Sequence, residues 1–145
     1  HLLDTIQKDM CNEDNSCCVL LADIDCFKTI NDTHGHALGD KVLQQVMHEL
    51  SKNLRSKDTL IRWGGDEILI VLPSIKLDSA LKMADRLRTV IESCKFPRIE
   101  EVTMSFGVVT WKRKELKTSV LRRADEQLYL AKANGRNCIF PHSVP

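Results

Sequence analysis

Short apolar runs alternate along this chain with segments in which apolar residues recur every three or four positions. Apolar or alternating runs between turn signals predict β-strands, which we place at 17–22, 59–63, 66–72, 102–109 and 138–140. The periodic segments predict five helices: one at the start of the chain, a short one after residue 26, one from Gly39, one capped by Asp78, and one over 120–131. Residues 12–16 are polar and predict a loop after the first helix. This order predicts an α+β fold with a ferredoxin-like central antiparallel sheet flanked by helices, which we expect on one face.

Two acidic pairs stand where predicted strands end or turn. Asp23 and Asp25 follow the run 17–22, which we expect to be buried on both faces, and Asp66-Glu67 follows two glycines typical of a two-residue hairpin turn. Taken alone, such acids are commonly helix caps or solvated side chains. Carboxylates that meet at one sheet edge repel unless a hard cation lies among them, and magnesium prefers such oxygens. Strict alternation along a strand would leave only one of Asp66 and Glu67 as a direct ligand.

Composition limits the partners of the chain. Its 145 residues are 43% apolar and 28% charged, which is typical of one globular domain. A net charge of +1 gives no global attraction to a nucleic acid polymer or an anionic membrane, so any phosphate site has to be built locally. The six cysteines show no CxxC spacing, which argues against zinc and favours reduced thiols. With no apolar run long enough for a bilayer, we expect a cytoplasmic domain without membrane contact of its own.

Basic residues near predicted helix ends are candidate phosphate ligands. Phe27 and Lys28 stand near the start of a short helix, where backbone N–H groups suit a phosphate. Lys132 and Arg136 stand at the end of the last long helix, where a favourable interaction with the helix dipole is the alternative explanation.

Five segments stand in order along the chain, at 23–32, 34–40, 62–67, 103–107 and 124–137. They resemble, with family-like spacing, the patterns DxDxFKxxND, GHxxGD, the signature itself, TxSxG and ADxALYxAKxxGRN of the GGDEF family of diguanylate cyclases. One such motif would be weak because short motifs recur by chance, but five in order are highly specific.

The resemblance implies a fold similar to nucleotidyl cyclases and the polymerase palm, and an enzyme that joins two GTP molecules into cyclic di-GMP with magnesium or manganese. It implies that the metal ligands are Asp23, the Ile24 carbonyl, Asp66 and Glu67. Asp66 would also be the base for the GTP 3′-hydroxyl, with Glu67 and Lys28 as further catalytic residues.

The resemblance also implies substrate-binding residues and a dimer. Asn31 and Asp40 would read the guanine edge with His36 and Phe27 nearby, and the triphosphate would be neutralised by Lys28, Lys132 and Arg136. A carboxylate accepts from guanine N1–H and the exocyclic amine, so such a site should reject adenine. Because each domain would hold one GTP, a two-fold homodimer is required for the cyclic product.

Residues 55–58 resemble the family's RxxD site, at which cyclic di-GMP binds and inhibits. Arg55 and Asp58 supply that pattern, and Arg86 on the next predicted helix is a further candidate contact. Arginine suits this role because it makes bidentate contacts with phosphate or guanine. The alternative is a solvated surface pair.

Two departures from the family pattern leave other functions open. Ile68 stands where the signature usually has Phe, which differs in shape although both are apolar strand formers. The family's opening segment, similar to DxLTGLxNRR, is absent, so we expect 1–145 to be a single GGDEF domain and a C-terminal or internal fragment of a longer bacterial signalling protein. The main alternative function is a weak or inactive domain that serves as a cyclic di-GMP receptor. Another nucleotidyl cyclase or a polymerase-like palm is a second alternative.

Overall fold

Helices and strands alternate along the chain much as the pattern predicts. The structure, a computed structural model, describes residues 2–11 and 16–142, so most of the loop predicted at 12–16 lies outside the described residues. The elements are α1 (Leu2–Cys11), β1 (Cys17–Ile24), α2 (Phe27–His34), α3 (His36–Lys52), β2 (Thr59–Arg62), β3 (Glu67–Pro73), α4 (Leu77–Ser93), β4 (Met104–Trp111), α5 (Lys117–Ala133) and β5 (Ile139–Phe140).

The strand β1 is the centre of the sheet. Within the described residues the sheet has five strands in the order β2-β3-β1-β4-β5. β1 pairs antiparallel with β3 and β4, whereas β4 and β5 run parallel because α5 crosses over between them. The α+β, ferredoxin-like class is confirmed, and the parallel edge makes the sheet mixed instead of wholly antiparallel.

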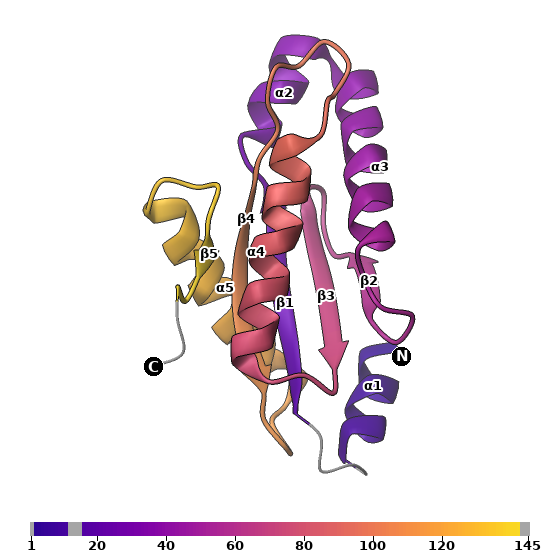
Figure 1. Ribbon diagram of the computed structural model, residues 1–145, viewed down its shortest axis with the longest axis vertical. Helices are drawn as coiled ribbons and strands as arrows, with labels where there is room; N and C mark the ends of the chain where they lie inside the picture. The colour runs from indigo at the N-terminus through magenta and orange to yellow at the C-terminus, as the bar shows by residue number, and fades with distance from the viewer. Residues whose placement is uncertain (1, 12–15, 143–145) are drawn as a thin grey trace.

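Helices cover both faces of the sheet, and the prediction of helices on one face is wrong. In β1, Cys18, Leu20 and Ala22 pack in one core with residues of α3 and α4, while Val19 and Leu21 pack in a second core with residues of α1 and α5. Figure 1 shows α4 in front of the sheet and α5 behind it. Every residue of β1 is buried, as the continuous apolar run predicts, and a strand buried on both faces needs cover on both.

The hairpin between β2 and β3 is longer than predicted. β2 ends at Arg62 and β3 begins at Glu67, so the connection contains Trp63 and Asp66 as well as the two glycines. The Trp63 N–H donates to the Glu67 carbonyl at 2.9 Å and closes this loop. Asp66 therefore lies off the strand, and strand alternation no longer forces it away from its neighbour Glu67.

The start of α4 also differs from the prediction. Lys76 occupies the N-cap position without a side-chain cap, and the helix begins at Leu77. Asp78 lies one residue further on, exposed, with its Oδ1 accepting a hydrogen bond from the Ser79 N–H at 2.9 Å. Its carboxylate is placed in the first turn, where it interacts favourably with the helix dipole.

Close packing of α5 on β4 depends on one glycine. A Cβ atom added at Gly107 would lie 2.4 Å from both the Ala124 carbonyl oxygen and the Leu128 nitrogen. Both atoms belong to the backbone of α5, so this helix approaches the sheet more closely than any side chain at that position allows. The approach matters for the site because α5 carries Lys132.

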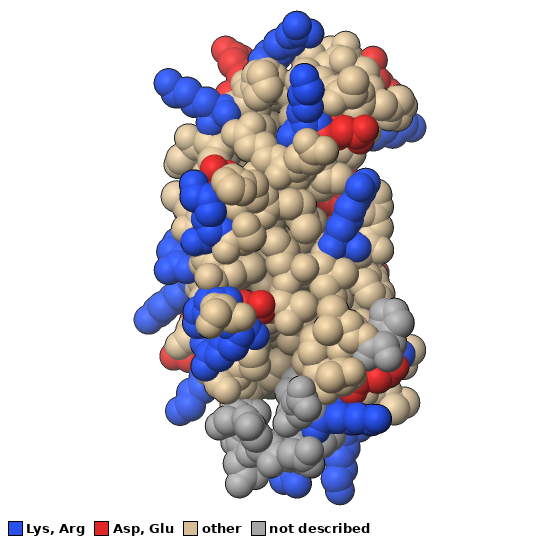
Figure 2. Space-filling view, turned by 90° about the vertical axis from the view of Figure 1, so that its right-hand side faces the viewer, with Lys and Arg blue, Asp and Glu red and all other residues tan. Residues whose placement is uncertain are grey.

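On the face that Figure 2 draws, Lys and Arg side chains lie along the edges and ends around a broad uncharged region, with fewer Asp and Glu side chains among them. Among the described helices, none has the length and apolar character needed to cross a membrane. Because the net charge of the whole chain is only +1, a phosphate ligand would have to be held by a local set of side chains and backbone groups.

Candidate active site

Carboxylates from two distant parts of the chain meet where β1 ends. Asp23 pairs in register with Glu67 on the adjacent strand β3, and this register places their side chains on the same face of the sheet. The Ile24 N–H donates to the Asp66 carbonyl at 3.4 Å, and the Asp66 carboxylate lies close enough to interact with that of Asp23. The structure thus brings Asp23 and Asp66 together, as the sequence predicts.

Asp23 is a buried acid that lies next to both a lysine and a second carboxylate. It is 6% exposed, its Oδ2 accepts a hydrogen bond from Lys132 Nζ, and its buried Oδ1 has no hydrogen-bond partner among the described residues. Burial and the Asp66 carboxylate raise the pKa of Asp23 to about 7, although Lys132 lowers it. Burial by itself lowers the pKa of Lys132, but the nearby carboxylates, Asp23 foremost, outweigh it and the pKa is raised. Lys132 thus interacts with three carboxylates, those of Asp23, Asp66 and Glu67, and the site has a deficit of positive charge.

This deficit fits a divalent cation. The unpaired, buried Oδ1 of Asp23 is an oxygen ligand of the kind that magnesium prefers. Within residues 2–11 and 16–142, no three His, Cys, Asp or Glu side chains gather into a ready-made metal site. An ion would therefore need Asp66 together with backbone oxygen, water or substrate phosphate, which is the way magnesium is commonly bound. The places of the Ile24 carbonyl and Glu67 in the ligand set stay predictions.

Asp25 does not join this acidic group, and it is neither a helix cap nor solvated. It is 8% exposed; its Oδ1 accepts from Ser105 Oγ at 2.6 Å, and its Oδ2 accepts from Thr103 Oγ1 at 2.7 Å and from the Asn137 N–H at 2.9 Å. The N-cap of α2 is Cys26, with φ 57° and no side-chain cap. Sequence reasoning gave Thr103, Ser105 and Asn137 no role, and the only signal was that they fall in family-like motifs.

The predicted guanine-binding residues lie on α2 and α3, which follow β1 and contact each other. Asn31 packs directly on Gly39, because a Cβ atom there would lie 1.8 Å from Asn31 Oδ1 and 3.5 Å from Phe27 Cζ. Asp40 follows Gly39 on α3 and is exposed, as is His36 at the start of that helix. The structure therefore groups Asn31, Phe27 and the stretch that carries Asp40, while His36 lies one helical turn earlier on the exposed surface.

The predicted phosphate ligands surround the end of β1. Lys28 is exposed on the first turn of α2, and Lys132 reaches Asp23 from α5, so its interaction goes beyond the helix dipole. Arg136, beyond the end of α5, lines a cavity of about 330 Å³ together with Cys26 and Asp25. The exposed Arg136 and Cys26, the N-cap residue of α2, thus line one space, whose acidic lining residues are Asp25 and Glu101.

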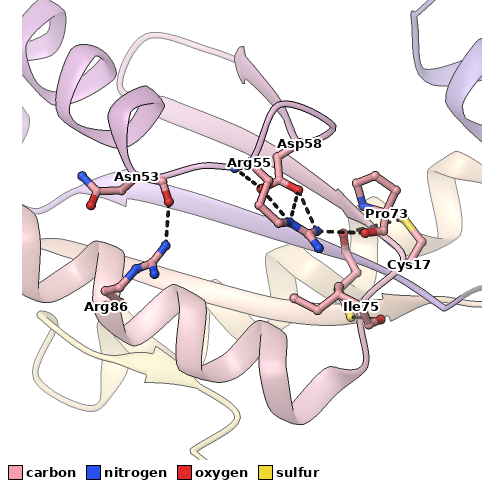
Figure 3. Close-up of polar contacts among 8 residues, drawn as sticks. Cys17, Asn53, Arg55, Asp58, Pro73, Ile75 and Arg86 are labelled. Carbon is pink, nitrogen blue, oxygen red and sulfur yellow. Dashed lines mark hydrogen bonds and ion pairs between the residues drawn. The ribbon is translucent and has the colours of Figure 1, made fainter.

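The predicted product site forms a closed contact in this structure. Arg55 Nε and Nη2 donate to Asp58 Oδ1 at 3.0 and 2.7 Å, and Nη2 also donates to the Pro73 carbonyl at 2.8 Å (Figure 3). The Asp58 side chain is 0% exposed, which rules out a solvated surface pair. Arg86 donates to the carbonyl of Asn53 at 2.7 Å, two residues before Arg55 (Figure 3). Arg86 thus bonds to the segment that carries Arg55, while the Asp58 carboxylate is occupied by Arg55.

Ile68 lies on the face of the sheet away from the acidic pair. It is fully buried in the core that includes residues of α3 and α4, whereas Leu69 belongs to the core on the α5 side. Alternation along β3 puts Glu67 on that second side. Ile in place of Phe therefore affects packing beneath α2 and α3 more than the surroundings of Asp23 and Asp66.

Comparison with known proteins identifies the family of this chain. The family described as "Diguanylate cyclase, GGDEF domain" matches residues 1–138, so the chain belongs to the GGDEF-domain family of diguanylate cyclases. It is 40% identical over 126 residues to the response regulator PleD of Caulobacter vibrioides, a match that covers 83% of this chain and 28% of PleD. It is 42% identical over 118 residues to the diguanylate cyclase DgcP of Pseudomonas aeruginosa, covering 79% of this chain and 18% of DgcP.

A solved structure is also similar over most of the chain. The GGDEF domain of DgcB from Caulobacter crescentus, in complex with c-di-GMP, has a TM-score of 0.86 and 28% sequence identity, covering 94% of this chain and 86% of that one. The fold is therefore shared with GGDEF domains almost from end to end. The chain spans less than a third of either curated relative, PleD or DgcP.

Proposed function

We propose that this domain condenses two GTP molecules into cyclic di-GMP and releases two pyrophosphates, as a homodimer that requires magnesium or manganese. The observation that carries the proposal is the meeting of Asp23, at the end of a fully buried strand, with Asp66 of the hairpin signature. A deficit of positive charge at a buried carboxylate is suited to a divalent ion that brings a triphosphate with it.

In each half-reaction the 3′-oxygen of one GTP forms a bond to the α-phosphorus of the other, and the bond from that phosphorus to pyrophosphate breaks. Asp66 takes the proton of the 3′-hydroxyl and passes it to solvent, and Glu67 assists. Lys28, Lys132 and Arg136 balance the charge on the triphosphate as pyrophosphate leaves. Magnesium, held by Asp23, Asp66 and phosphate oxygens, would lower the pKa of the attacking hydroxyl and stabilise the leaving oxygen.

Selectivity for guanine follows from the pair on α2 and α3. The Asp40 carboxylate would accept from guanine N1–H and the exocyclic amine, and the Asn31 amide would both donate and accept. Adenine offers the opposite pattern at these positions, which leaves polar groups of the site unpaired. An excess of ATP over GTP should therefore leave turnover unchanged, and strong inhibition by ATP would favour another nucleotidyl cyclase.

The direct test is to incubate the domain with GTP and magnesium over a wide range of protein concentration and to detect cyclic di-GMP by chromatography. Because two domains must face each other, activity per molecule should rise with concentration until the dimer is saturated. Asp66→Asn should abolish product formation, while the matched control Asp78→Asn, on the exposed start of α4, should not. A folded, dimeric domain that forms no product would contradict the proposal.

A receptor that binds cyclic di-GMP without turnover is the second candidate. It is favoured by the contact between Arg55 and Asp58, by the hydrogen bond from Arg86 to Asn53 two residues before Arg55, and by the similar DgcB domain, which was solved in complex with c-di-GMP. Calorimetry separates the two functions together with the turnover assay. A receptor binds cyclic di-GMP tightly, loses binding in Arg55→Ala and makes no product, whereas a product-inhibited cyclase shows both binding and turnover.

A further inference from the structure

The two carboxylates at the end of β1 have opposite environments although they are two residues apart. Asp23 has a buried oxygen without a hydrogen-bond partner among the described residues. Asp25 is buried to a similar degree, but its two oxygens accept hydrogen bonds from three donors in two parts of the chain, Thr103 and Ser105 in one and Asn137 in the other. Both oxygens of Asp25 thus have hydrogen-bond partners, whereas Oδ1 of Asp23 has none among the described residues. The groups that Asp25 binds therefore indicate its function.

One of the anchored groups belongs to an unusual turn after α5. Gly135, Arg136 and Asn137 have φ values of 102°, 60° and 45°, so three consecutive residues adopt left-handed backbone. Non-glycine residues disfavour this region and keep it only where the surroundings hold them there. Two hydrogen bonds from backbone N–H groups do so: Arg136 N–H donates to the Ala131 carbonyl at 3.1 Å, and Asn137 N–H donates to the side-chain carboxylate of Asp25 at 2.9 Å.

The same turn is held from its other side by α4. Arg88 Nη1 donates to Asn137 Oδ1 at 2.9 Å, and Asn137 Nδ2 donates to the Glu92 carboxylate. Asn137 is therefore fixed by its backbone to the end of β1 and by its side chain to α4. The residue before it, Arg136, makes the exposed part of the turn and lines the cavity that Asp25 also borders.

We propose that Asp25 is a positioning residue that holds the turn 135–137 in its left-handed conformation and thereby aims Arg136 at the triphosphate. The role of Arg136 in this statement rests on the proposed function. A guanidinium binds phosphate well only at hydrogen-bond distance and in the right orientation, and a displacement of about 1 Å can cost up to roughly a hundredfold in rate. Asp25 acts through the backbone of its neighbour and touches neither metal nor nucleotide.

Two substitutions separate this role from metal ligation. Asp25→Ala removes all three hydrogen bonds. Asp25→Asn keeps an acceptor for the Asn137 N–H, and its amide group can donate to the Ser105 hydroxyl, so it preserves the anchor while removing the charge. The matched control is Asp78→Ala, which removes an exposed carboxylate from α4, whose start lies at the end of the sheet opposite to where β1 ends (Figure 1).

The experiment measures two quantities on each variant. The first is the hydrogen-exchange rate of the amides at 136 and 137, which needs no nucleotide. The second is the affinity for a non-hydrolysable GTP analogue and for GMP, with manganese present. Asp25→Ala should speed exchange at 137 and weaken binding of the GTP analogue about tenfold, with GMP affinity unchanged, because only the triphosphate end reaches Arg136. Asp25→Asn and Asp78→Ala should behave as wild type.

Each outcome decides a different point. Unchanged exchange at 137 in folded Asp25→Ala, or equal losses for GMP and the GTP analogue, would overturn the positioning role. Loss of manganese binding in Asp25→Asn would show that Asp25 is a metal ligand, which also overturns it. If Asp25→Ala does not fold, Asp25→Asn still decides, because a hydrogen-bond anchor survives this change and a ligand does not. A wild-type domain that bound neither nucleotide would defeat the proposed function, while exchange at 137 would still show whether Asp25 holds the turn.

Discussion

Replacement of Gly107 by alanine tests the close packing of α5 on the sheet. The new Cβ atom would lie 2.4 Å from two backbone atoms of α5, the Ala124 carbonyl oxygen and the Leu128 nitrogen. A backbone segment inside a helix cannot turn away as a side chain can, so α5 has to shift or the strand has to bend. Overpacking commonly costs 1–3 kcal/mol, and we expect about 3 kcal/mol here because both contacts are with backbone.

This free energy converts into a measurable change in melting temperature. An entropy of unfolding of roughly 2.1 cal/mol/K per residue gives about 0.3 kcal/mol/K for a chain of this length, so the melting temperature should fall by about 10 °C. Circular dichroism during heating measures the fall, and urea unfolding checks it as a free energy. The matched control is Gly65→Ala, where a Cβ atom would meet nothing within 4 Å. If Gly107→Ala melted within about 2 °C of that control, the account of α5 packing would be wrong.

Three other changes test the nucleotide site, an ion pair and the product site. Gly39→Ala puts a Cβ atom 1.8 Å from Asn31 Oδ1, so the amide must leave its position; calorimetry should show about tenfold weaker GTP binding, the worth of one lost hydrogen bond. Hydrogen bonds from the Arg123 guanidinium are the main cause that lowers the pKa of Glu115 to about 2, and the Glu115 side chain is 10% exposed. Ionised Glu115 should therefore stabilise the fold by up to about 3 kcal/mol above pH 4.5. The difference in unfolding free energy between wild type and Glu115→Gln, measured with urea, should disappear as the pH falls through about 2. Arg55→Ala leaves a buried carboxylate without its partner and should lower the unfolding free energy by about 2 kcal/mol, less than for a fully buried pair because Arg55 is 32% exposed.

Each of these has its own control or contradiction. Unaltered GTP affinity in Gly39→Ala would mean that the Asn31 amide, which packs on Gly39, does not bind guanine. A Glu115→Gln difference that stayed constant from neutral pH to pH 2 would remove the ion pair as its cause. For Arg55, the double variant Arg55→Ala/Asp58→Ala should be more stable than Arg55→Ala alone, and additive losses would show that the two side chains are independent.

Much of the fold was predictable because the buried strands β1 and β3 are runs of consecutive apolar residues. The continuous apolar run before Asp23 gave the central strand, and helical spacing gave α3, α4 and α5. The hairpin length was not predictable, because two glycines suit a two-residue turn equally well and the longer loop is set by the bond from Trp63 N–H to the Glu67 carbonyl. Cover on both faces did follow from a doubly buried strand, and our one-face prediction missed that consequence.

Part of the candidate site was also predictable from the sequence, and part was not. Asp23 and Asp66 were predictable as partners because acids at a strand end and at a hairpin tip can only be tolerated there with compensation. The anchoring role of Asp25 was not predictable, because its three donors lie 78 to 112 residues away and reach it only in the folded chain. The closed state of Arg55 and Asp58 was likewise hidden, since the RxxD pattern gives spacing but not the carbonyl of Pro73 that completes the contact.

The most direct test of the central claim is a manganese titration followed by electron paramagnetic resonance, with a non-hydrolysable GTP analogue present. If Asp23 and Asp66 together hold the ion against the triphosphate, wild type binds manganese and either Asp23→Asn or Asp66→Asn weakens that binding by at least about tenfold, with the fold intact. Manganese affinity that stayed at the wild-type level in both variants would contradict the account.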